Sequence, residues 1–410
     1  MRLIVYSHDA FGLGNIRRML AICQHLLATI PQASILVLSG SPAIQNFEIP
    51  ARLDYIKLPC LGRDRYGKLA AKYLTSDVSE TVKLRSNLIE TAILNFKPDL
   101  VLVDKKPYGL LGELKASLDL LKKHSPQTKL VLLLRDILDT PKVTVKEWQK
   151  HGYYQAIQYY YSRVLVVGKP DIFDLVEEYN FPQNVTDKTT YCGYIKKAFP
   201  LTSIDLIRKQ LGLKTQEKLI VVTPGGGEDG YSLIKNYLLV QPHINNRCDC
   251  KTLMVFGSEM PTVARESLSR LIKDNPHIIT LNFTDKLMSY LQAADLVISM
   301  AGYNTITEIL SLCKRAVVIP RQKPSQEQLI RASRMEKKGL LRMVNPDNLT
   351  IDDFQEAIFK QLSNNSKINS CFNFEGLSKI REEIINLISS NRAINLVAHK
   401  EELDFYPLAI

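Results

Sequence analysis

The chain has 410 residues, of which 45% are hydrophobic and 23% are charged. This is a globular composition, and it excludes a disordered or fibrous chain. The length exceeds what one ordinary hydrophobic core supports, so we expect two domains. The seven cysteines are scattered singly apart from Cys248 and Cys250, and this odd, unspaced set argues against a disulfide framework and favours a reducing compartment. The Cys248-Asp-Cys250 pair lacks a second ligand pair at zinc-like spacing, so we expect a plain loop there.

The formal net charge is +11 and the isoelectric point is about 9.1. Excess basic residues suit phosphate-bearing substrates, an anionic membrane surface or nucleic acid. Because these residues are dispersed and form no nucleic-acid-binding motif, we expect no nucleic acid partner. No apolar run is long enough to span a membrane, and the N-terminus becomes polar too soon for a signal peptide. We therefore expect a cytoplasmic protein, whose basic surface would allow peripheral contact with the inner face of a membrane.

Short β-branched runs alternate with helical segments in the first half of the chain. Such continuous apolar runs are typical of parallel strands buried on both faces. Residues 16–27 and 84–95 place apolar side chains at three- and four-residue steps, which predicts amphipathic helices. The predicted strands are residues 2–7, 34–39, 53–58, 99–104, 129–135 and 163–168.

The same alternation restarts after Gly193. Residues 202–205, Thr-Ser-Ile-Asp, resemble a capping box that opens a helix toward Leu211. A last helix is predicted at residues 376–389, followed by an irregular tail. The predicted strands of this half are residues 218–223, 252–256, 277–281, 295–299 and 316–320.

This alternation predicts an α/β fold with two doubly wound, Rossmann-like parallel-sheet domains that face a cleft. We place the domains at residues 1–197 and 198–375, with residues 376–410 as a separate C-terminal segment. Ligands of such sheets bind beyond the carboxyl ends of the strands. The loops at these strand ends are therefore the candidate sites.

One candidate loop is rich in glycine and follows the predicted strand at residues 218–223. Gly225, Gly226 and Gly227 would let the backbone approach a ligand, and N–H groups at the start of the next helix, near Tyr231, would attract a diphosphate. The Lys-Ser/Thr pair of a Walker loop is missing. A glycine-rich turn without a ligand is an equal alternative.

The most informative stretch is residues 295–310. A strand ends just before a turn at Gly302, and a helix begins at about Tyr303. N–H groups near Gly302 and Asn304 would then face a phosphate. Glu308, in the second helical turn, could accept both hydroxyls of a ribose, although a surface glutamate on an amphipathic helix is the commoner case.

A third polar loop follows the strand at residues 316–320. Gln326, Glu327 and Gln328 offer groups that bind sugar hydroxyls, and a solvated loop is the alternative. Because the three loops lie at strand ends of one sheet, we expect them to converge on one site.

These motifs give the second half a resemblance to the C-terminal domain of glycosyltransferase family 28, which includes the peptidoglycan N-acetylglucosaminyltransferases. The residues that carry it are the glycine loop, Ala-Gly-Tyr-Asn-Thr-Ile-Thr-Glu-Ile at 301–309 and Gln-Glu-Gln at 326–328. Residues 6–18 resemble the N-terminal loop of predicted bacterial glycosyltransferases related to that family. The acceptor-contacting loops of the first half match nothing specific.

The resemblance implies the GT-B fold and a nucleotide-sugar donor, with UDP as the nucleotide. Residues 1–197 would then bind the acceptor and residues 198–375 the donor, and a helix in the C-terminal segment would cross back to the first domain. Glu308 would bind the ribose, and the backbone at Thr284 would face the nucleobase. The implied donor-binding residues are Gly225, Gly226, Gly227, Thr284, Gly302, Tyr303, Asn304, Thr305, Glu308, Gln326, Glu327 and Gln328.

Inverting transfer, which the resemblance also implies, needs a base to take the proton of the acceptor. Related proteins usually carry histidine where this chain has Asn15, and a neutral amide cannot accept a proton. His8 and Asp9 at the end of the first strand are the predicted replacements, with Asp104 third; a structural role for His8 is an equal alternative. The predicted acceptor or phosphate loop comprises Gly12, Gly14, Asn15 and Arg18.

We therefore expect a glycosyltransferase that moves a sugar from a UDP-linked donor to a hydroxyl of a small-molecule or lipid acceptor. We expect no cofactor and no metal, since the nearest Asp-x-Asp-like pattern, residues 136–139, lies in the acceptor half. Three alternatives stay open: a UDP-sugar 2-epimerase, a non-catalytic nucleotide-sugar-binding protein, and a basic nucleic-acid-binding protein. The acceptor and the oligomeric state do not follow from the sequence.

Overall fold

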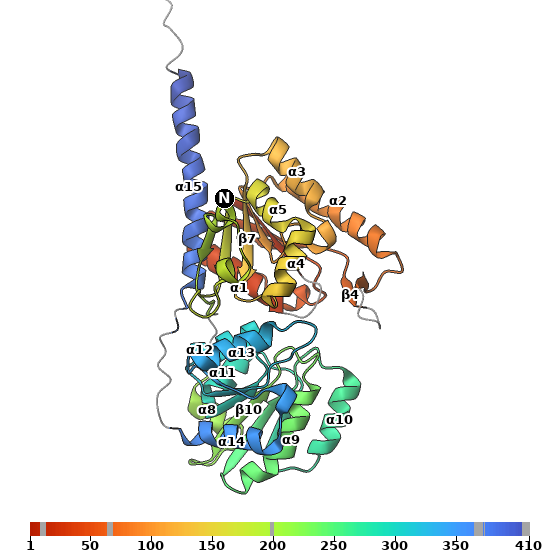
Figure 1. Ribbon diagram of the computed structural model, residues 1–410, viewed down its shortest axis with the longest axis vertical. Helices are drawn as coiled ribbons and strands as arrows, with labels where there is room; N and C mark the ends of the chain where they lie inside the picture. Colours follow the sequence, from red (N-terminus) through yellow and green to blue (C-terminus); the bar gives the residue numbers. More distant parts are fainter. Residues whose placement is uncertain (9–13, 64–68, 197–200, 365–371, 373, 404–410) are drawn as a thin grey trace, which may run out of the picture.

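The computed structural model describes residues 1–8, 14–63, 69–196, 201–364, 372 and 374–403 (Figure 1). Two lobes follow one another along the chain, and each is built on its own parallel sheet. Asp9 and Gly12 of the predicted site lie outside the described residues.

The first lobe contains a seven-stranded sheet in the order β3-β2-β1-β6-β7-β8-β9. All neighbouring strands pair in parallel. The strands are β1 (Arg2–Ser7), β2 (Ser34–Ser39), β3 (Leu53–Lys57), β6 (Leu100–Asp104), β7 (Lys129–Arg135), β8 (Arg163–Val167) and β9 (Thr189–Tyr191), and a separate antiparallel pair is formed by β4 (Leu61–Arg63) and β5 (Leu69–Ala71).

Helices cover both faces of this sheet because its strands are apolar on both sides. Successive side chains of β1 alternate between the two faces, so Leu3 and Val5 join one core cluster while Ile4 and Tyr6 join the other. The helices are α1 (Gly14–Thr29) on the first face, with α2 (Val78–Phe96), α3 (Lys115–His124), α4 (Pro141–His151) and α5 (Tyr153–Tyr160) on the second; α6 (Leu175–Glu178) and α7 (Gln183–Thr186) are short.

The second lobe contains a six-stranded parallel sheet in the order β12-β11-β10-β13-β14-β15. Its strands are β10 (Lys218–Thr223), β11 (Cys250–Val255), β12 (Ile278–Leu281), β13 (Leu296–Ser299), β14 (Ala316–Val318) and β15 (Arg342–Met343). One face is covered by α9 (Tyr231–Asn245), α10 (Thr262–Ile272) and α14 (Ile351–Ser363), and the other by α8 (Ile204–Gln210), α11 (Leu287–Ala293), α12 (Tyr303–Ser311) and α13 (Glu327–Lys337).

Each sheet changes the direction of its strand order once. In the first sheet this switch point lies between β1 and β6, and in the second between β10 and β13. The loops that leave neighbouring strands there diverge to opposite faces and open a crevice at the carboxyl ends, where doubly wound sheets bind ligands. The predicted α/β class with two doubly wound sheets is confirmed.

The last helix, α15 (Gly376–Leu403), returns to the first lobe and runs beside it (Figure 1). The Gly376 N–H donates to the Tyr194 carbonyl at 3.1 Å, and Ile380 and Ile384 are buried in the core cluster that includes α1. The helix extends beyond residue 389, so the prediction of an irregular tail was wrong for residues 390–403. That stretch contains no proline or glycine to end a helix.

The start of α8 also differs from the prediction. Ser203, rather than Thr202, caps this helix, and its hydroxyl accepts the Leu206 N–H at 3.4 Å. The Thr202 N–H instead donates to the hydroxyl of Ser289 in α11 at 3.0 Å. Since Ser203 is the N-cap residue, Thr202 lies one residue before it, and the capping box predicted for residues 202–205 does not form.

Candidate functional site

The glycine loop after β10 has two positions at which the backbone requires glycine. Gly225 and Gly227 adopt φ values of 86° and 100°, which side-chain-bearing residues rarely adopt. A Cβ atom on Gly227 would lie 2.4 Å from the Phe256 carbonyl oxygen, whereas one on Gly225 would lie 2.9 Å from Oγ1 of Thr305. Gly227 therefore allows two backbones to pack, and Gly225 brings the loop against α12.

Gly226 packs beside a flexible side chain. Its carbonyl accepts the Glu259 N–H at 2.8 Å, and an added Cβ would lie 2.8 Å from the Glu259 carboxylate. The loop ends at α9, which begins at Tyr231 as predicted, and Gly230 provides no side-chain cap for its first N–H groups. N–H groups without a side-chain cap at a helix start are the donors that bind phosphate.

The loop after β13 leads into α12 in the same manner. Gly302 is the N-cap residue, it has an ordinary φ of −63°, and no side chain caps the helix. The helix begins at Tyr303 as predicted, so the backbone N–H groups of its first turn point toward the switch point. The Tyr303 ring itself is buried and stacks on Tyr194 at 5.8 Å, so only its backbone could contact a phosphate.

Two predicted donor residues of α12 contact the first lobe. The side-chain amide of Asn304 donates to the Gly14 carbonyl at 3.1 Å. Glu308 is 5% exposed and forms an ion pair with Arg17 at 3.7 Å. The carboxylate predicted to bind the ribose is therefore covered by an arginine of the other lobe.

The third predicted loop forms the start of α13. The side-chain oxygen of Gln328 accepts the N–H groups of Ala301 at 3.1 Å and of Arg321 at 3.3 Å, so it connects the loops after β13 and β14. The Gln326 N–H donates to the Asp139 carboxylate of the first lobe at 3.0 Å. Both residues thus lie at the strand ends. Gln328 connects two loops of the second lobe, and Gln326 contacts the first lobe.

Glu327 is buried among arginines. It lies 2.8 Å from Arg331, 3.3 Å from Arg321 and 4.0 Å from Arg135. Burial raises the pKa of its carboxyl, but the charges of Arg331, Arg135 and Arg321 outweigh burial and lower the pKa to about 2. Glu327 is consequently ionised at neutral pH.

Arg331 and Asp136 join the two lobes, and the sequence analysis did not identify this pair. Two guanidinium nitrogens of Arg331 donate to the two carboxylate oxygens of Asp136 at 2.7 and 2.8 Å, and both side chains are buried. The Tyr303 ring is near two guanidinium groups, since those of Arg18 and Arg331 are each 5.8 Å from its centroid. The pair spans 195 positions in sequence, so only the folded arrangement reveals it.

The switch point of the first sheet holds a second buried ion pair. Arg18 donates to one Asp104 oxygen at 2.7 Å, and the His8 N–H donates to the other at 3.3 Å. The Asn15 amide donates to the His8 carbonyl at 2.6 Å and accepts from Arg18 at 3.2 Å. Arg18 and Asp104 therefore form an ion pair in this structure, and the Arg18 Nε has no hydrogen-bond partner among the described residues. Their predicted roles in binding phosphate and accepting a proton remain predictions.

The His8 side chain is only 4% exposed, and its Nδ1 has no hydrogen-bond partner within the described part of the chain. Burial lowers the pKa of His8 well below its usual value, and the nearby charges of Lys105 and Lys106 lower it further. The imidazole is therefore neutral at pH 7. A neutral imidazole nitrogen can accept either a hydrogen bond or a proton.

Thr284 follows β12, which is the edge strand of the second sheet. Its hydroxyl accepts the Lys286 N–H at 3.0 Å. The adjacent Phe283 is 62% exposed. Strands β11 and β10 lie between β12 and β13 in the sheet. The predicted nucleobase contact therefore lies at the same edge of the sheet as the β13 loop, but at its outermost strand.

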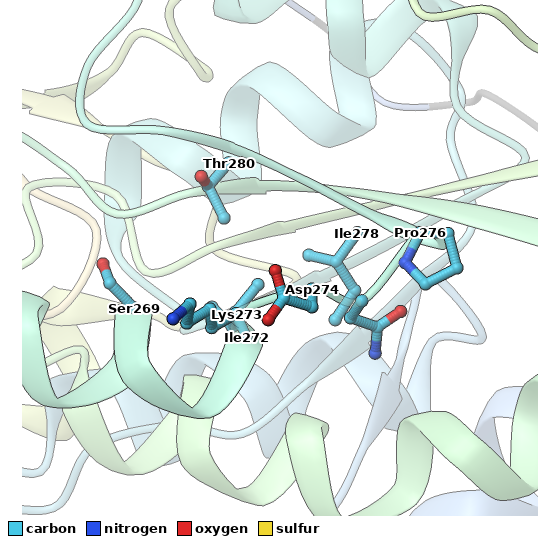
Figure 2. A pocket seen from close by; sticks show the side chains of 8 residues that line it. Ser269, Ile272, Lys273, Asp274, Pro276, Ile278 and Thr280 are labelled. Carbon is cyan, nitrogen blue, oxygen red and sulfur yellow. The ribbon is translucent and has the colours of Figure 1, made fainter.

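A hollow of about 440 Å³ in the second lobe lies away from these loops (Figure 2). It is formed by residues from the end of α10 and the beginning of β12, among them Ser269, Lys273, Asp274 and Thr280. Residues that precede a parallel strand lie at the edge opposite to the strand ends. This hollow is consequently not part of the predicted donor site.

Two further observations concern ions and membranes. Over the residues that the structure describes, no group of three or more His, Cys, Asp or Glu side chains is arranged to hold a metal ion. Cys250 lies in β11 rather than in a loop with Cys248. Among the described residues, no helix is both long enough and apolar enough to cross a bilayer.

Comparisons with known proteins agree with the fold, and a family match includes the three predicted loops. Residues 219–381 match the family model described as glycosyltransferase family 28 C-terminal domain. A relative from Clostridioides difficile (strain 630), a UDP-N-acetylglucosamine--N-acetylmuramyl-(pentapeptide) pyrophosphoryl-undecaprenol N-acetylglucosamine transferase, is 24% identical over 221 residues, which are 52% of this chain and 53% of the relative. The chain thus spans about half the length of the curated relatives that it matches.

Two solved structures share the whole fold at low sequence identity. MurG of Acinetobacter baumannii has a TM-score of 0.54 and 14% identity, and the match covers 95% of this chain and 99% of that protein. UDP-GlcNAc 2-epimerase of Methanocaldococcus jannaschii has a TM-score of 0.62 and 13% identity, covering 94% and 100%. At these identities, the likeness shows the fold alone. The family match covers residues 219–381 of the 410, so the second lobe resembles the glycosyltransferase family 28 C-terminal domain, while the chain as a whole has the GT-B fold.

Proposed function

We propose that the protein is a glycosyltransferase that moves a sugar from a UDP-linked donor to an acceptor hydroxyl, with inversion and without a cofactor. The observation that carries the proposal is the pair of loops at the switch point of the family 28 domain. They bring together Gly225 and Thr305, and they lead into two helices whose first N–H groups have no side-chain cap. Such amides can stabilise both a bound diphosphate and the negative charge that develops as it departs.

Donor binding would require a local change at Glu308. Its ion pair with Arg17 is 3.7 Å long, and the Arg17 side chain is 35% exposed. Ribose hydroxyls donating to Glu308 would take the place of this guanidinium, since a partly exposed ion pair contributes little stability. Donor binding would therefore loosen one contact between the lobes at the point where an acceptor enters.

In the proposed transfer, the acceptor oxygen forms a bond to the anomeric carbon of the sugar. The bond between that carbon and the diphosphate oxygen breaks, and its electron pair leaves with UDP. The acceptor proton passes to a base. His8 fits this role better than Asp104, because its Nδ1 has no partner within the described residues, whereas Asp104 is paired with Arg18. Asp9 remains a prediction.

For the acceptor, we propose a small molecule or a lipid, with contact of the first lobe to the inner face of a membrane. The Clostridioides difficile relative is named for an acceptor linked to pyrophosphoryl-undecaprenol. The first lobe exposes Tyr73 and Leu74 beside Lys72, which suits an anionic bilayer surface. Sedimentation with phosphatidylglycerol vesicles should carry the protein down, and recovery in the supernatant would contradict the membrane contact.

A binding and turnover experiment tests the function. Wild-type protein is titrated with UDP by calorimetry, and UDP-N-acetylglucosamine is then incubated with the protein, alone and with a lipid-pyrophosphate acceptor. The proposal predicts UDP binding and acceptor-dependent release of UDP. Conversion of the sugar nucleotide when incubated alone would instead establish a 2-epimerase. Absence of UDP binding would refute the assignment.

A further inference from the structure

The turn that follows β6 has an unusual backbone. Lys105 has a φ of 71°, and the Lys106 N–H donates to the Asp104 carbonyl at 2.9 Å, which closes a three-residue turn around Lys105. Turns of this kind with a positive φ at the central residue are rare and strained. Strain in a residue other than glycine is most often found at functional sites.

The loop that carries Lys105 is fixed from two sides. The Leu110 N–H donates to the Tyr6 hydroxyl at 2.9 Å, and Tyr6 donates to Glu113 at 2.6 Å. The Tyr161 hydroxyl donates to the Pro107 carbonyl. All three of these side chains are buried, so Lys105 projects from a rigid loop at the switch point of the first sheet.

Charges of both signs lie near Lys105: Arg135 and Lys106 are positive, and Asp104 and Glu327 are negative. Lys106 is paired with Glu147 at 2.5 Å, whereas the Lys105 ammonium has no hydrogen bond or ion pair within the described residues. Burial and the positive charges of Arg135 and Lys106 together lower the pKa of Lys105 to about 8. The negative charge of Asp104 raises this pKa, but by less than the other effects lower it. The two carboxylates that act on Lys105, Asp104 and Glu327, are paired with Arg18 and Arg331, so an anion could bind at the Lys105 ammonium.

Arg135 and His8 provide a second, independent indication. The nearest carboxylate to Arg135 is Glu327 at 4.0 Å, which already serves Arg331 and Arg321, and the buried Nε of Arg135 makes no hydrogen bond to a described residue. The His8 Nδ1 is likewise buried and unpartnered in the described chain. The charges of Lys105 and Arg135 both act on His8, so the three side chains lie near the same strand ends. Buried polar atoms without a partner call for an explanation, and an ion or ligand is one.

We propose that this crevice binds an anionic group of the acceptor, a phosphate or a carboxylate, through the Lys105 ammonium and the Arg135 guanidinium. The inference rests on the proposed function and gives the acceptor a chemical class. The crevice belongs to the first sheet, whereas the loops assigned to the donor diphosphate belong to the second. Arg135 is 4.0 Å from Glu327 of the donor lobe, so the bound anion would lie beside the donor sugar.

Calorimetric titration of the UDP-saturated full chain with inorganic pyrophosphate, and separately with malonate, tests the site. At least one probe should bind, and Lys105→Met should weaken it about tenfold or more, as expected for loss of a charge-assisted hydrogen bond. Lys105→Arg, which keeps the charge, should retain more affinity. The matched control is Lys129→Met, because Lys129 begins β7 at the opposite edge of the same sheet. The probe that binds more tightly identifies the anion.

The outcomes separate this inference from the proposed function. If the wild type binds neither probe, or if both Lys105 variants bind like the wild type, the crevice is not an anion site. If Lys105→Met weakens UDP itself by the same factor, the crevice holds the donor diphosphate and the acceptor assignment is wrong. A wild type that fails to bind UDP would refute the proposed function, while the dependence of pyrophosphate binding on Lys105 would still be measured.

Discussion

The buried carboxylates of the protein differ in the arginines that they face. Asp104, Asp136 and Glu327 each lie within 2.8 Å of an arginine that is itself buried. Glu308 faces Arg17 at the longer distance of 3.7 Å, and Arg17 is partly exposed. A ligand can displace a solvated guanidinium far more easily than a buried one. Glu308 is therefore the carboxylate best suited to exchange an arginine for ribose hydroxyls.

Replacing Glu308 with alanine should weaken UDP binding by roughly tenfold or more, because two hydrogen bonds to a charged group would be lost. Calorimetry with UDP measures the change. Glu356→Ala, on the exposed side of α14, serves as the matched control and should bind like the wild type. Equal affinities for the two variants would remove Glu308 from the donor site.

The pH dependence of stability should report the burial of His8. Its pKa in the folded protein lies below the unfolded value of 6.5, so the unfolded chain takes up the proton first as the pH falls. The stabilisation from neutral His8 is fully present above pH 6.5 and is lost as the pH falls toward the folded pKa. Urea unfolding at pH 7.5 and 5.5 should show a smaller loss in His8→Gln than in the wild type. Identical losses would mean that His8 is not buried as a neutral group.

At the scale of elements, the loops after β10 and β13 use glycine for different reasons. Gly227 has a φ of 100° and lies against the Phe256 backbone, whereas Gly302 has a φ of −63° and no atom closer than 3.9 Å to an added Cβ. The first glycine is required by the fold, and the second is not. The sequence alone does not distinguish these two glycines, because both lie in turns between a strand and a helix.

Gly227→Ala should lower the free energy of unfolding by about 1–3 kcal/mol, because alanine would be forced into a sparsely populated conformation. Gly302→Ala should leave the free energy of unfolding near the wild-type value. Chemical denaturation of the two variants gives the comparison. A Gly302→Ala protein that is as unstable as Gly227→Ala would contradict this view of the two loops.

Local signals in the sequence predicted the elements that carry the site, but not the partners of its side chains. The strand ends at Thr223 and Ser299 and the helix starts at Tyr231 and Tyr303 were predicted, because apolar runs and glycine turns are local features. The arginine that neutralises Asp104 was not predicted as its partner, because the two lie 86 positions apart. The extent of α15 was underestimated because a helix with weak amphipathicity gives little periodic signal.

Across the whole molecule, the lobes are joined by polar contacts of two kinds. The pair of Arg331 and Asp136 is buried, whereas the pair of Arg334 and Glu178 has the Arg334 side chain 45% exposed. Removing one partner of a buried pair leaves an uncompensated charge, while an exposed pair contributes little. The buried pair should therefore contribute more than the exposed pair to the stability of the contact between the lobes.

Asp136→Asn should lower the apparent free energy of unfolding by about 3–5 kcal/mol, since the Arg331 charge would lose its bidentate partner. Arg334→Ala removes a partly exposed pair between the lobes and should cost no more than about 1 kcal/mol. Urea denaturation followed by circular dichroism compares them. Equal effects would show that burial does not distinguish these two contacts.

A crystal structure of the protein with UDP tests the central claim most directly. We predict that the diphosphate oxygens lie about 3 Å from backbone N–H groups at the glycine loop and at the start of α12. The ribose hydroxyls should reach Glu308, with Arg17 displaced. UDP bound elsewhere, or a switch-point crevice that stays closed by its own side chains at saturating UDP, would contradict the account.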